Sequence, residues 1–199
     1  MKPTDIGKAY NQITHLWECE DFNRENGIDQ HKRAVGFVKN RGKALDVGCG
    51  STGRIIQLLI EEGFTPEGID ISESMITLAK QKHPDITFHN HDICEWQITE
   101  TFDFISAWDS IWHLSPRLQE KVIKKLINAL NVNGVMIFSF GGLDKTDEHT
   151  DNAMGVDMYY STLGINAYLS LIMKQNSICR HLENDQGSKG HTYVIVQKI

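Results

Sequence analysis

Short apolar runs alternate with amphipathic segments through the middle of the chain. Five runs have the length and the continuous apolar character of buried strands, and they cover residues 44–47, 65–69, 86–90, 102–107 and 134–140. The segments between them place apolar residues at three- and four-residue spacings, which predicts helices over 52–62, 72–83 and 116–130. Strands that alternate with helices in this way predict a parallel sheet with helices on both faces.

Residues at the segment ends support these boundaries. Ser72 is an expected N-cap, and Ser115 before Pro116 is a second cap with proline at the first helical position. Pro84 and Gly134 are expected to stop the helices that precede them.

The two ends of the chain follow other patterns. Residues 4–38 are predicted to form two amphipathic helices that cap the sheet, in which Tyr10 and Trp17 either pack or cover a ligand. A polar loop is expected over 143–157 and a helix over 159–174. The last two strand-like runs are 177–183 and 192–198, which predict an antiparallel hairpin at the sheet edge.

Composition narrows the possible partners. The 199 residues suffice for one domain. The net charge of -6, with no Lys/Arg block longer than the Lys124-Lys125 pair, argues against nucleic acid. The longest apolar runs, such as 135–140, are too short to span a bilayer, and no targeting segment is recognisable. We therefore expect a soluble cytoplasmic protein that binds no membrane.

The four cysteines point to the same compartment. They are scattered and form no C-x-x-C pair, which argues against a zinc site, a dithiol redox site or a disulfide framework; they are Cys19, Cys49, Cys94 and Cys179. Reduced thiols in a cytoplasm fit this spacing best.

Residues 43–54, KALDVGCGSTGR, predict a ligand site. A strand, a glycine-rich turn and a helix start place free backbone N–H groups at the carboxyl end of a strand, where open α/β sheets bind ligands. A P-loop would need a Gly-Lys-Ser/Thr sequence, which this stretch does not contain. The spacing of Gly48, Gly50 and Gly53 also matches a dinucleotide fingerprint, with Asp70 further on to hold a ribose.

Asp46 argues against a dinucleotide, because its carboxylate would repel a pyrophosphate. S-adenosylmethionine fits better, since it carries an ammonium and a sulfonium and no phosphate. Asp70 can hold its ribose, and Asp92 can accept a hydrogen bond from the adenine amine. Each acid alone could be a cap or turn residue. Three acids at three successive strand ends favour a cofactor site.

Several stretches, in this order, resemble the motifs of the class I S-adenosylmethionine-dependent methyltransferases. They are residues 44–54, 67–80, 92–93, 102–114 and 133–140. The resemblance implies a Rossmann-like, doubly wound, seven-stranded sheet that is mostly parallel with an antiparallel last strand. It also implies S-adenosylmethionine as cofactor and S-adenosylhomocysteine as product.

The resemblance assigns cofactor contacts residue by residue. The expected cofactor-binding residues are Asp46, Gly48, Cys49, Gly50, Arg54, Asp70, Ile71, Met75, Asp92, Ile93, Ala107 and Trp108. Asp70 matches the ribose-binding acid, Ile71 and Met75 the apolar side of the adenine slot, and Asp92 the adenine edge. Thr52 stands where the family usually has a third glycine, which leaves the detailed geometry of the loop open.

Two residues of the stretch WDSIWHL are catalytic candidates. Asp109 and His113 are four residues apart and would share one face if the segment is helical. His113 is either a base or substrate contact or a structural histidine. A base is needed only where the acceptor must lose a proton, because methyl transfer mainly requires alignment of the acceptor and exclusion of water.

Other histidines have two interpretations each. A polar, solvated loop explains His149 and its neighbouring acids better than a metal site does, so no metal is expected; these acids are Asp144, Asp147 and Asp151. His89 and His91 project to one face at strand spacing, as an edge pair rather than a ligand pair.

These features together predict one methyltransferase domain over 1–199 that acts on a small-molecule acceptor. Its expected parts are a helical cap (1–40), a cofactor-binding core (41–140), an acceptor-pocket loop and helix (141–174) and a strand hairpin (175–199). One alternative is a non-catalytic S-adenosylmethionine-binding regulatory or partner subunit. Another is a nicotinamide-linked oxidoreductase.

Overall fold

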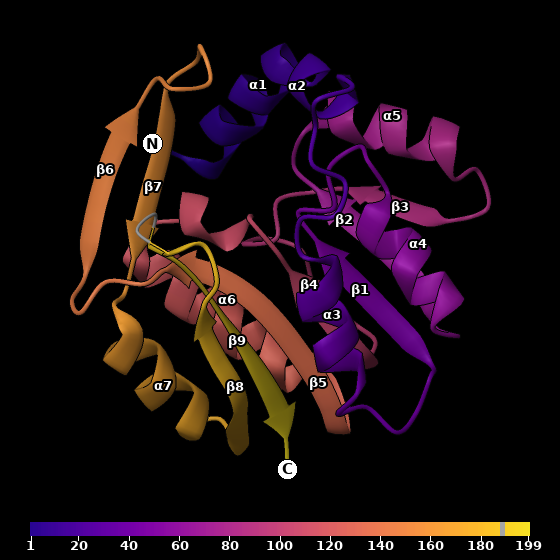
Figure 1. Ribbon diagram of the computed structural model, residues 1–199, viewed down its shortest axis with the longest axis vertical. Helices are drawn as coiled ribbons and strands as arrows, with labels where there is room; N and C mark the ends of the chain where they lie inside the picture. Colours follow the sequence, from indigo (N-terminus) through magenta and orange to yellow (C-terminus); the bar gives the residue numbers. More distant parts are fainter. Residues whose placement is uncertain (188–189) are drawn as a thin grey trace.

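One twisted sheet organises the chain, as the computed structural model of residues 1–187 and 190–199 shows (Figure 1). Its order is β3-β2-β1-β4-β5-β9-β8. The strands are β1 (Lys43–Val47), β2 (Thr65–Asp70), β3 (Thr87–Asn90), β4 (Phe102–Ala107), β5 (Leu130–Gly141), β8 (Ser177–Asn184) and β9 (His191–Lys198). β1 to β5 pair in parallel, and β9 runs antiparallel to both β5 and β8. The predicted mostly parallel seven-stranded sheet with an antiparallel last strand is confirmed.

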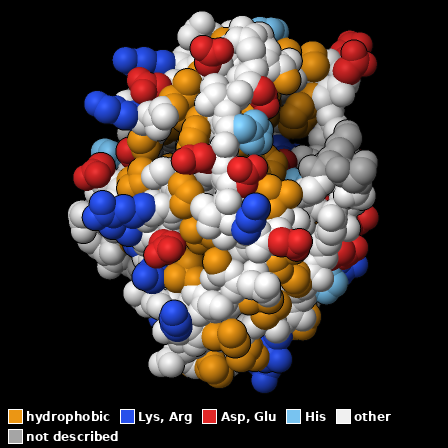
Figure 2. Space-filling view, turned by 90° about the vertical axis from the view of Figure 1, so that its left-hand side faces the viewer, with side chains coloured by type: hydrophobic (Ala, Val, Ile, Leu, Met, Phe, Trp, Pro, Cys, Tyr) orange, Lys and Arg blue, Asp and Glu red, His pale blue; other side chains and the backbone are white. Residues whose placement is uncertain are grey.

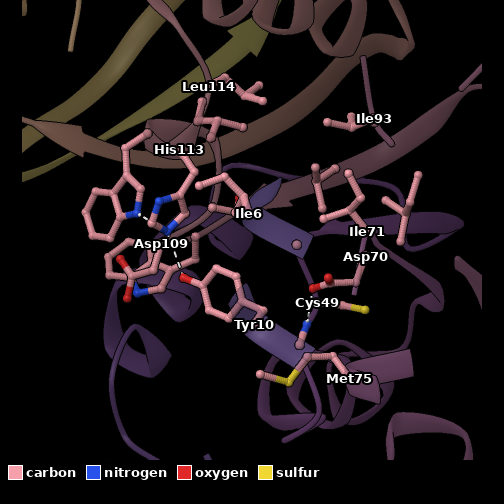
Figure 3. Close-up of a pocket in the computed structure, with 18 of the residues that line it drawn as sticks. Ile6, Tyr10, Cys49, Asp70, Ile71, Met75, Ile93, Asp109, His113 and Leu114 are labelled. Carbon is pink, nitrogen blue, oxygen red and sulfur yellow. Dashed lines mark hydrogen bonds between the residues drawn. The ribbon is translucent and has the colours of Figure 1, made fainter. Parts of the chain in front are cut away.

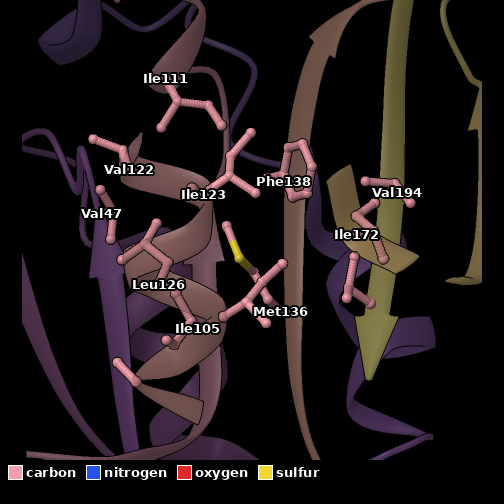
Figure 4. Close-up of a cluster of buried hydrophobic side chains, with 14 of the residues drawn as sticks. Val47, Ile105, Ile111, Val122, Ile123, Leu126, Met136, Phe138, Ile172 and Val194 are labelled. Atoms are coloured by element: carbon pink, nitrogen blue, oxygen red, sulfur yellow. The ribbon is translucent and has the colours of Figure 1, made fainter. Parts of the chain in front are cut away.

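Helices cover both faces of this sheet. The helices are α1 (Pro3–Ile13), α2 (His15–Glu18), α3 (Ile28–Val35), α4 (Arg54–Glu61), α5 (Glu73–Lys82), α6 (Pro116–Asn128) and α7 (Ile165–Met173), with a short 3-10 turn, η1 (Ile111–His113). Figure 4 shows Val122, Ile123 and Leu126 of α6 packed against buried strand residues such as Met136 and Phe138. Residues of α3 and α4 pack with side chains from the opposite face. Fully burying each such apolar side chain contributes about 1.5–3 kcal/mol.

The predicted helix over 159–174 is wrong in its first part. Met158–Thr162 forms strand β7, which pairs antiparallel with β6 (Asp147–Asp151) inside the stretch expected to be a polar loop. The run MYYST is rich in residues that favour strands, and its buried members Met158 and Tyr159 pack against α1. The helical pattern therefore begins only at Ile165.

β5 also begins earlier than the sequence predicts. α6 ends at Asn128, and β5 starts at Leu130 rather than at residue 134. Asn133 has a φ of 67°, and the pairing with β4 shifts register near Phe102 and Phe104. Asn133 and Gly134 are thus an irregularity within a strand and not a helix stop.

Two further properties of the described residues concern their helices and their cysteines. None of their helices has both the length and the apolar character required to cross a membrane. All four cysteines are free thiols.

Candidate cofactor and acceptor site

A cavity of about 290 Å³, here the first cavity, lies at the carboxyl ends of β1, β2 and β4. The chain continues from β1 to β2 on one side and reaches β4 on the other, so the strand order reverses at this point. Open α/β sheets bind their ligands at such switch points. Figure 3 shows side chains from the glycine loop, from the ends of β2 and β4 and from the N-terminal cap around it.

The glycine loop has three left-handed positions. Gly48, Gly50 and Gly53 have φ values of 72°, 58° and 68°. At Gly53 the left-handed φ favours glycine, and an added Cβ would also lie 2.1 Å from Nε2 of His83, so the imidazole would have to move. Thr52 is buried, and its hydroxyl accepts a hydrogen bond from Arg54 at 3.1 Å. The third glycine is therefore displaced by one position, and Thr52 supports the arginine side chain.

Asp70 lies on the wall of the first cavity with both carboxylate oxygens engaged by the backbone. Oδ2 accepts from the Gly50 N–H at 2.9 Å and Oδ1 from the Ser72 N–H at 2.8 Å. Burial raises the pKa of Asp70, and these hydrogen bonds oppose that shift. Ser72 itself caps α5 by accepting from the Met75 N–H at 3.2 Å. Asp70 is therefore not the helix cap, and its remaining acceptor positions are available to a ligand.

The next strand end adds Asp92, Ile93 and His91 to the same wall. Asp92 also holds a turn, since Oδ1 accepts from the Cys94 N–H at 2.8 Å. The two histidines of this segment have different surroundings. His89, on the edge strand β3, contacts Glu67 at 3.0 Å, while the exposed His91 follows the strand and lies on the rim of the cavity.

Two expected contact residues lie behind the wall. Asp46 and Ala107 are buried and do not line the first cavity. Asp46 bonds to Ser106, whose hydroxyl lies 2.9 Å from Nε2 of His31. Burial raises the pKa of Asp46 to about 6. The Asp46 carboxyl group, expected beside the ligand, is therefore part of a row of buried hydrogen-bonded side chains, Asp46, Ser106 and His31, and not of the cavity surface.

Arg54 brings a positive charge to the cavity. Among the described residues on the wall, it is the only Lys or Arg. Its Nε donates to the Asn26 carbonyl at 3.0 Å, and its guanidinium lies 5.4 Å from the centre of the Phe22 ring. Burial lowers the pKa of Arg54, while Asp109 and Asp46 act in the opposite direction. This side chain can bind a ligand carboxylate.

The stretch WDSIWHL is not an α-helix, so the condition under which Asp109 and His113 would share a helix face is not met. Asp109 has a φ of 51°, and the following residues form the 3-10 turn η1. Both residues nevertheless line the first cavity. The left-handed backbone at Asp109 and the tight turn η1 bring both side chains to the cavity. Helical spacing is not needed for this.

His113 has both ring nitrogens occupied. Nδ1 lies 2.8 Å from the Tyr159 carbonyl, which can only accept, so Nδ1 carries the proton. Nε2 then accepts from the Tyr10 hydroxyl at 2.7 Å and from the Trp112 indole at 3.1 Å (Figure 3). Burial lowers the pKa of His113 to about 4. The imidazole is neutral at physiological pH.

Asp109 accepts hydrogen bonds from three side chains. The donors are Asn26 at 2.8 Å, His191 at 2.9 Å and Ser139 at 3.1 Å. Burial alone would raise the pKa of Asp109, but these donors outweigh it and lower the pKa. Sequence reasoning missed Asn26 and His191, because neither lies in a recognisable motif. Tyr10 was noticed only through its place in an amphipathic pattern.

A second cavity, also about 290 Å³, shares Trp112 and Tyr160 with the first. Asp147, His149 and Asp151 of β6 line it, and the His149 ring stacks on Tyr160 at 5.2 Å. Within residues 1–187 and 190–199, no group of three or more Asp, Glu, His or Cys side chains is arranged to hold a metal. Figure 2 views the side of the molecule that carries β6, β7 and α7, where acidic and basic side chains are interspersed among hydrophobic ones.

Comparison with known proteins identifies similar chains. Residues 44–134 match the family described as "Methyltransferase domain". An uncharacterized methyltransferase of Bacillus cytotoxicus is 30% identical over 143 residues, which cover 68% of this chain and 67% of that protein. Carboxy-S-adenosyl-L-methionine synthase of Sulfurimonas denitrificans is 32% identical over 108 residues, 51% of this chain, and the match spans only 46% of its length.

A solved structure shares the fold. It is the S-adenosylmethionine-bound amino pentose methyltransferase CalS10 from Micromonospora echinaspora, with a TM-score of 0.69 and 13% identity. The superposition covers 90% of this chain and 93% of that one.

Proposed function

The chain belongs to the class I S-adenosylmethionine-dependent methyltransferases, and from this premise we propose that it methylates a small-molecule acceptor. This is a family of enzymes whose cofactor is S-adenosylmethionine and whose product is S-adenosylhomocysteine. When bound, the cofactor supplies a methyl group on a positively charged sulfur, which an acceptor lone pair takes in an in-line displacement. The remaining task of the protein is to bind the cofactor and the acceptor, to align the two reacting atoms and to exclude water.

The first cavity fits the nucleoside part of this cofactor. Asp70 presents a carboxylate for the ribose hydroxyls, and Ile71, Met75 and Ile93 provide apolar contacts for the adenine. Asp92 lies beside them for the adenine amine. The observation that carries the proposal is that the Asp70 carboxylate lies beside this group of apolar side chains at the point where the strand order reverses.

An unpaired donor fits the amino-acid part. The Trp108 indole N–H has no hydrogen-bond partner among the described residues, although Trp108 is only 4% exposed and lines the first cavity. A buried donor without a partner is costly, and a ligand acceptor would remove that cost. Arg54 offers a charged donor on the same wall. We assign these two residues to the cofactor carboxylate.

The covering of the cavity supports a small acceptor. Pro3, Ile6 and Tyr10 of α1 and Trp17 of α2 lie on its wall together with the loop residue Phe22. A cavity of about 290 Å³ that is partly covered by these side chains has room for a small molecule and not for a folded macromolecule. The related fold of an amino pentose methyltransferase agrees with an acceptor of this size. A cytoplasmic location is part of the proposal, supported by the four free thiols.

Asp109 and His113 are the proposed acceptor-facing residues. His113 is neutral, but the lone pair on its unprotonated Nε2 already accepts hydrogen bonds from Tyr10 and Trp112. It can therefore act as a base only when these donors move away, and otherwise it orients the Tyr10 hydroxyl. Asp109 keeps a charged carboxylate on the wall without any such rearrangement. Its contribution is to hold a donor group of the acceptor.

Titration calorimetry with S-adenosylhomocysteine tests the cofactor assignment. We expect binding by the native protein and an affinity about 10- to 100-fold lower for Asp70→Ala, which removes hydrogen bonds to a charged acceptor. The control is Asp144→Ala, which removes an exposed carboxylate. A folded native protein that does not bind S-adenosylhomocysteine contradicts the proposal.

Mass spectrometry of reactions with methyl-labelled S-adenosylmethionine tests the activity itself. A panel of amine and hydroxyl acceptors should include a labelled product. Cofactor binding without any labelled product would favour the non-catalytic alternative, a regulatory or partner subunit.

A further inference from the structure

His191, the first residue of β9, lies between two carboxylates. Its Nε2 is 2.9 Å from Oδ1 of Asp109, and its Nδ1 is 2.5 Å from Oδ1 of Asp185. The side chains of His191 and Asp185 are 5% and 6% exposed. Gln30 of α3 donates to the other oxygen of Asp185 at 2.6 Å. This is a buried network of charged groups that the cofactor assignments above do not use.

The geometry sets the protonation of His191. A carboxylate accepts hydrogen bonds, so contacts to carboxylates from both ring nitrogens require a proton on each of them. Two indole rings also lie beside the imidazole, those of Trp108 and Trp112, with ring centres 5.1 and 5.6 Å away. Burial alone lowers the pKa of His191, but Asp109 and Asp185 outweigh it and raise the pKa. His191 is an imidazolium at neutral pH.

Asp109 has one acceptor position to spare. A carboxylate can accept about four hydrogen bonds. Among the described residues, His191 and Ser139 donate to Oδ1 of Asp109, and Asn26 alone donates to Oδ2. Asp109 lies on the wall of the first cavity, and its left-handed φ of 51° is a conformation that non-glycine residues adopt mainly where the surroundings enforce it. The free position on Oδ2 is available to a bound molecule.

Asp109 lies in a different part of the first cavity from the residues assigned to the nucleoside. Its partner His191 lines the second cavity, which meets the first at Trp112 and Tyr160. The residues assigned to ribose and adenine lie at other strand ends, since Asp70 is the last residue of β2 and Asp92 follows β3. Asp109 therefore belongs to the end of the first cavity that leads to the second.

We propose that His191, held by Asp185, is a positioning residue that fixes Asp109 as a carboxylate at the acceptor end of the first cavity, and that the acceptor is an amine. The inference rests on the proposed function, because it names the chemistry of the acceptor for that same site. The three groups together carry one net negative charge, and Oδ2 can accept a further hydrogen bond. A neutral amine can donate an N–H to Oδ2 and keep its lone pair for the methyl group. On transfer the positive charge moves from the sulfonium to this nitrogen, where the Asp109 carboxylate stabilises it, and the surplus proton then leaves to solvent. Asp147 and Asp151 on the second cavity disfavour an anionic acceptor.

Three related ligands test this without knowledge of the acceptor. S-adenosylhomocysteine has a neutral thioether, S-adenosylmethionine has a sulfonium, and sinefungin carries an amine at the position of the transferable methyl. All three share the same amino-acid end. Calorimetry would compare the native protein with Asp109→Asn, His191→Gln and Asp185→Asn. The control is His89→Gln, which removes a histidine paired with Glu67 away from the cavities.

We expect the preference for sinefungin over S-adenosylhomocysteine to fall about 10-fold in Asp109→Asn and about 3- to 10-fold in the other two variants. Affinity for S-adenosylhomocysteine should stay within about threefold of the native value, because the neutral thioether does not use the carboxylate. His89→Gln should change neither quantity.

Two results would overturn the inference. One is an unchanged preference in His191→Gln and Asp185→Asn. The other is an equal loss of affinity for all three ligands, which would assign Asp109 to the ammonium of the cofactor. A native protein that binds none of the ligands would contradict the proposed function instead.

Nitrogen-15 NMR gives a readout that does not depend on ligand binding. Long-range proton–nitrogen spectra should show both nitrogens of His191 protonated at pH 7.5 in the native protein. In Asp185→Asn the same ring should lose a proton at lower pH, because one stabilising charge is gone. A neutral His191 in the folded native protein at pH 7 contradicts the assignment.

Discussion

His113 shows how one buried side chain can tie folding stability to pH. Its ring is neutral because Nδ1 donates to a carbonyl and Nε2 accepts from two donors, and burial lowers its pKa to about 4. The unfolded chain has a histidine of ordinary pKa, about 6.5. Between these values the unfolded chain binds more protons. Stability is therefore intact above about pH 6.5 and is lost as the pH falls towards 4.

The variant His113→Gln should reduce this acid sensitivity. Glutamine does not titrate, so the difference in unfolding free energy between pH 7.5 and pH 5 should shrink by about 2 kcal/mol, as follows from the two pKa values. Urea denaturation at the two pH values measures it. The exposed His15→Gln is the control. An undiminished pH dependence in His113→Gln would show that this histidine is not the source.

The buried position of Asp46 leads us to expect that its mutation has little effect on cofactor affinity. It does not line the first cavity, and its carboxyl group forms a hydrogen bond with Ser106, so we expect no direct contact with the cofactor. We expect Asp46→Asn to alter the affinity for S-adenosylhomocysteine by less than about threefold, in contrast to Asp70→Ala. Calorimetry at pH 7.5 compares them. A loss as large as that of Asp70→Ala would mean that Asp46 acts on the cofactor.

At the scale of elements, α1 is the part of the cap that rests on the site. Its apolar side chains Ile6, Ala9 and Ile13 pack with β7, and Asn11 accepts from the Ser72 hydroxyl at 2.7 Å. Tyr10 adds a hydrogen bond to His113 beside the cavity. The position of α1 therefore determines how far the first cavity is covered on this side.

Tyr10→Phe should loosen α1 without affecting the sheet. The change removes one buried hydrogen bond, worth about 1–2 kcal/mol, while Trp112 still satisfies Nε2 of His113. Amide exchange over Pro3–Ile13 should become about 5- to 30-fold faster, and exchange in β1 and β4 should not change. Tyr160→Phe is the matched control, because its ring also contacts His113. Equal exchange in α1 of both variants would count against a role for the Tyr10 hydroxyl.

At the scale of the whole molecule, one sheet carries both the site and the elements around it. The cofactor residues follow β1 to β4, while His191 begins β9 on the far side of β5. Parts that share a sheet are expected to unfold in one transition. Ligand binding at the strand ends should then stabilise the entire chain.

S-adenosylhomocysteine should therefore raise the melting temperature in a single transition. At a ligand concentration about 100 times its dissociation constant the stabilisation is about 2.7 kcal/mol. For a chain of 199 residues this corresponds to about 5–11 °C. Scanning calorimetry measures the shift, and Asp70→Ala at the same ligand concentration should show a smaller one. Two separate transitions, only one of them sensitive to ligand, would contradict a single cooperative unit.

Much of the core could be predicted from the sequence because its signals are local. Continuous apolar runs, the cap at Ser72 and the glycine spacing after β1 depend on neighbours in the chain. The hairpin of β6 and β7 was missed because Met158–Thr162 owes its strand form to pairing with β6 and burial against α1. Such contacts between distant segments leave little trace in a local pattern.

The sequence by itself determined the sheet class, the glycine loop and the acids at the ends of β2 and β3, since these follow from periodicity and short-range spacing. The tertiary structure alone decided that Asp46 lies behind the wall and that His191 meets Asp109. These last two residues are 82 positions apart. The physical reason is that burial, hydrogen-bond partners and protonation depend on which distant side chains the fold brings together.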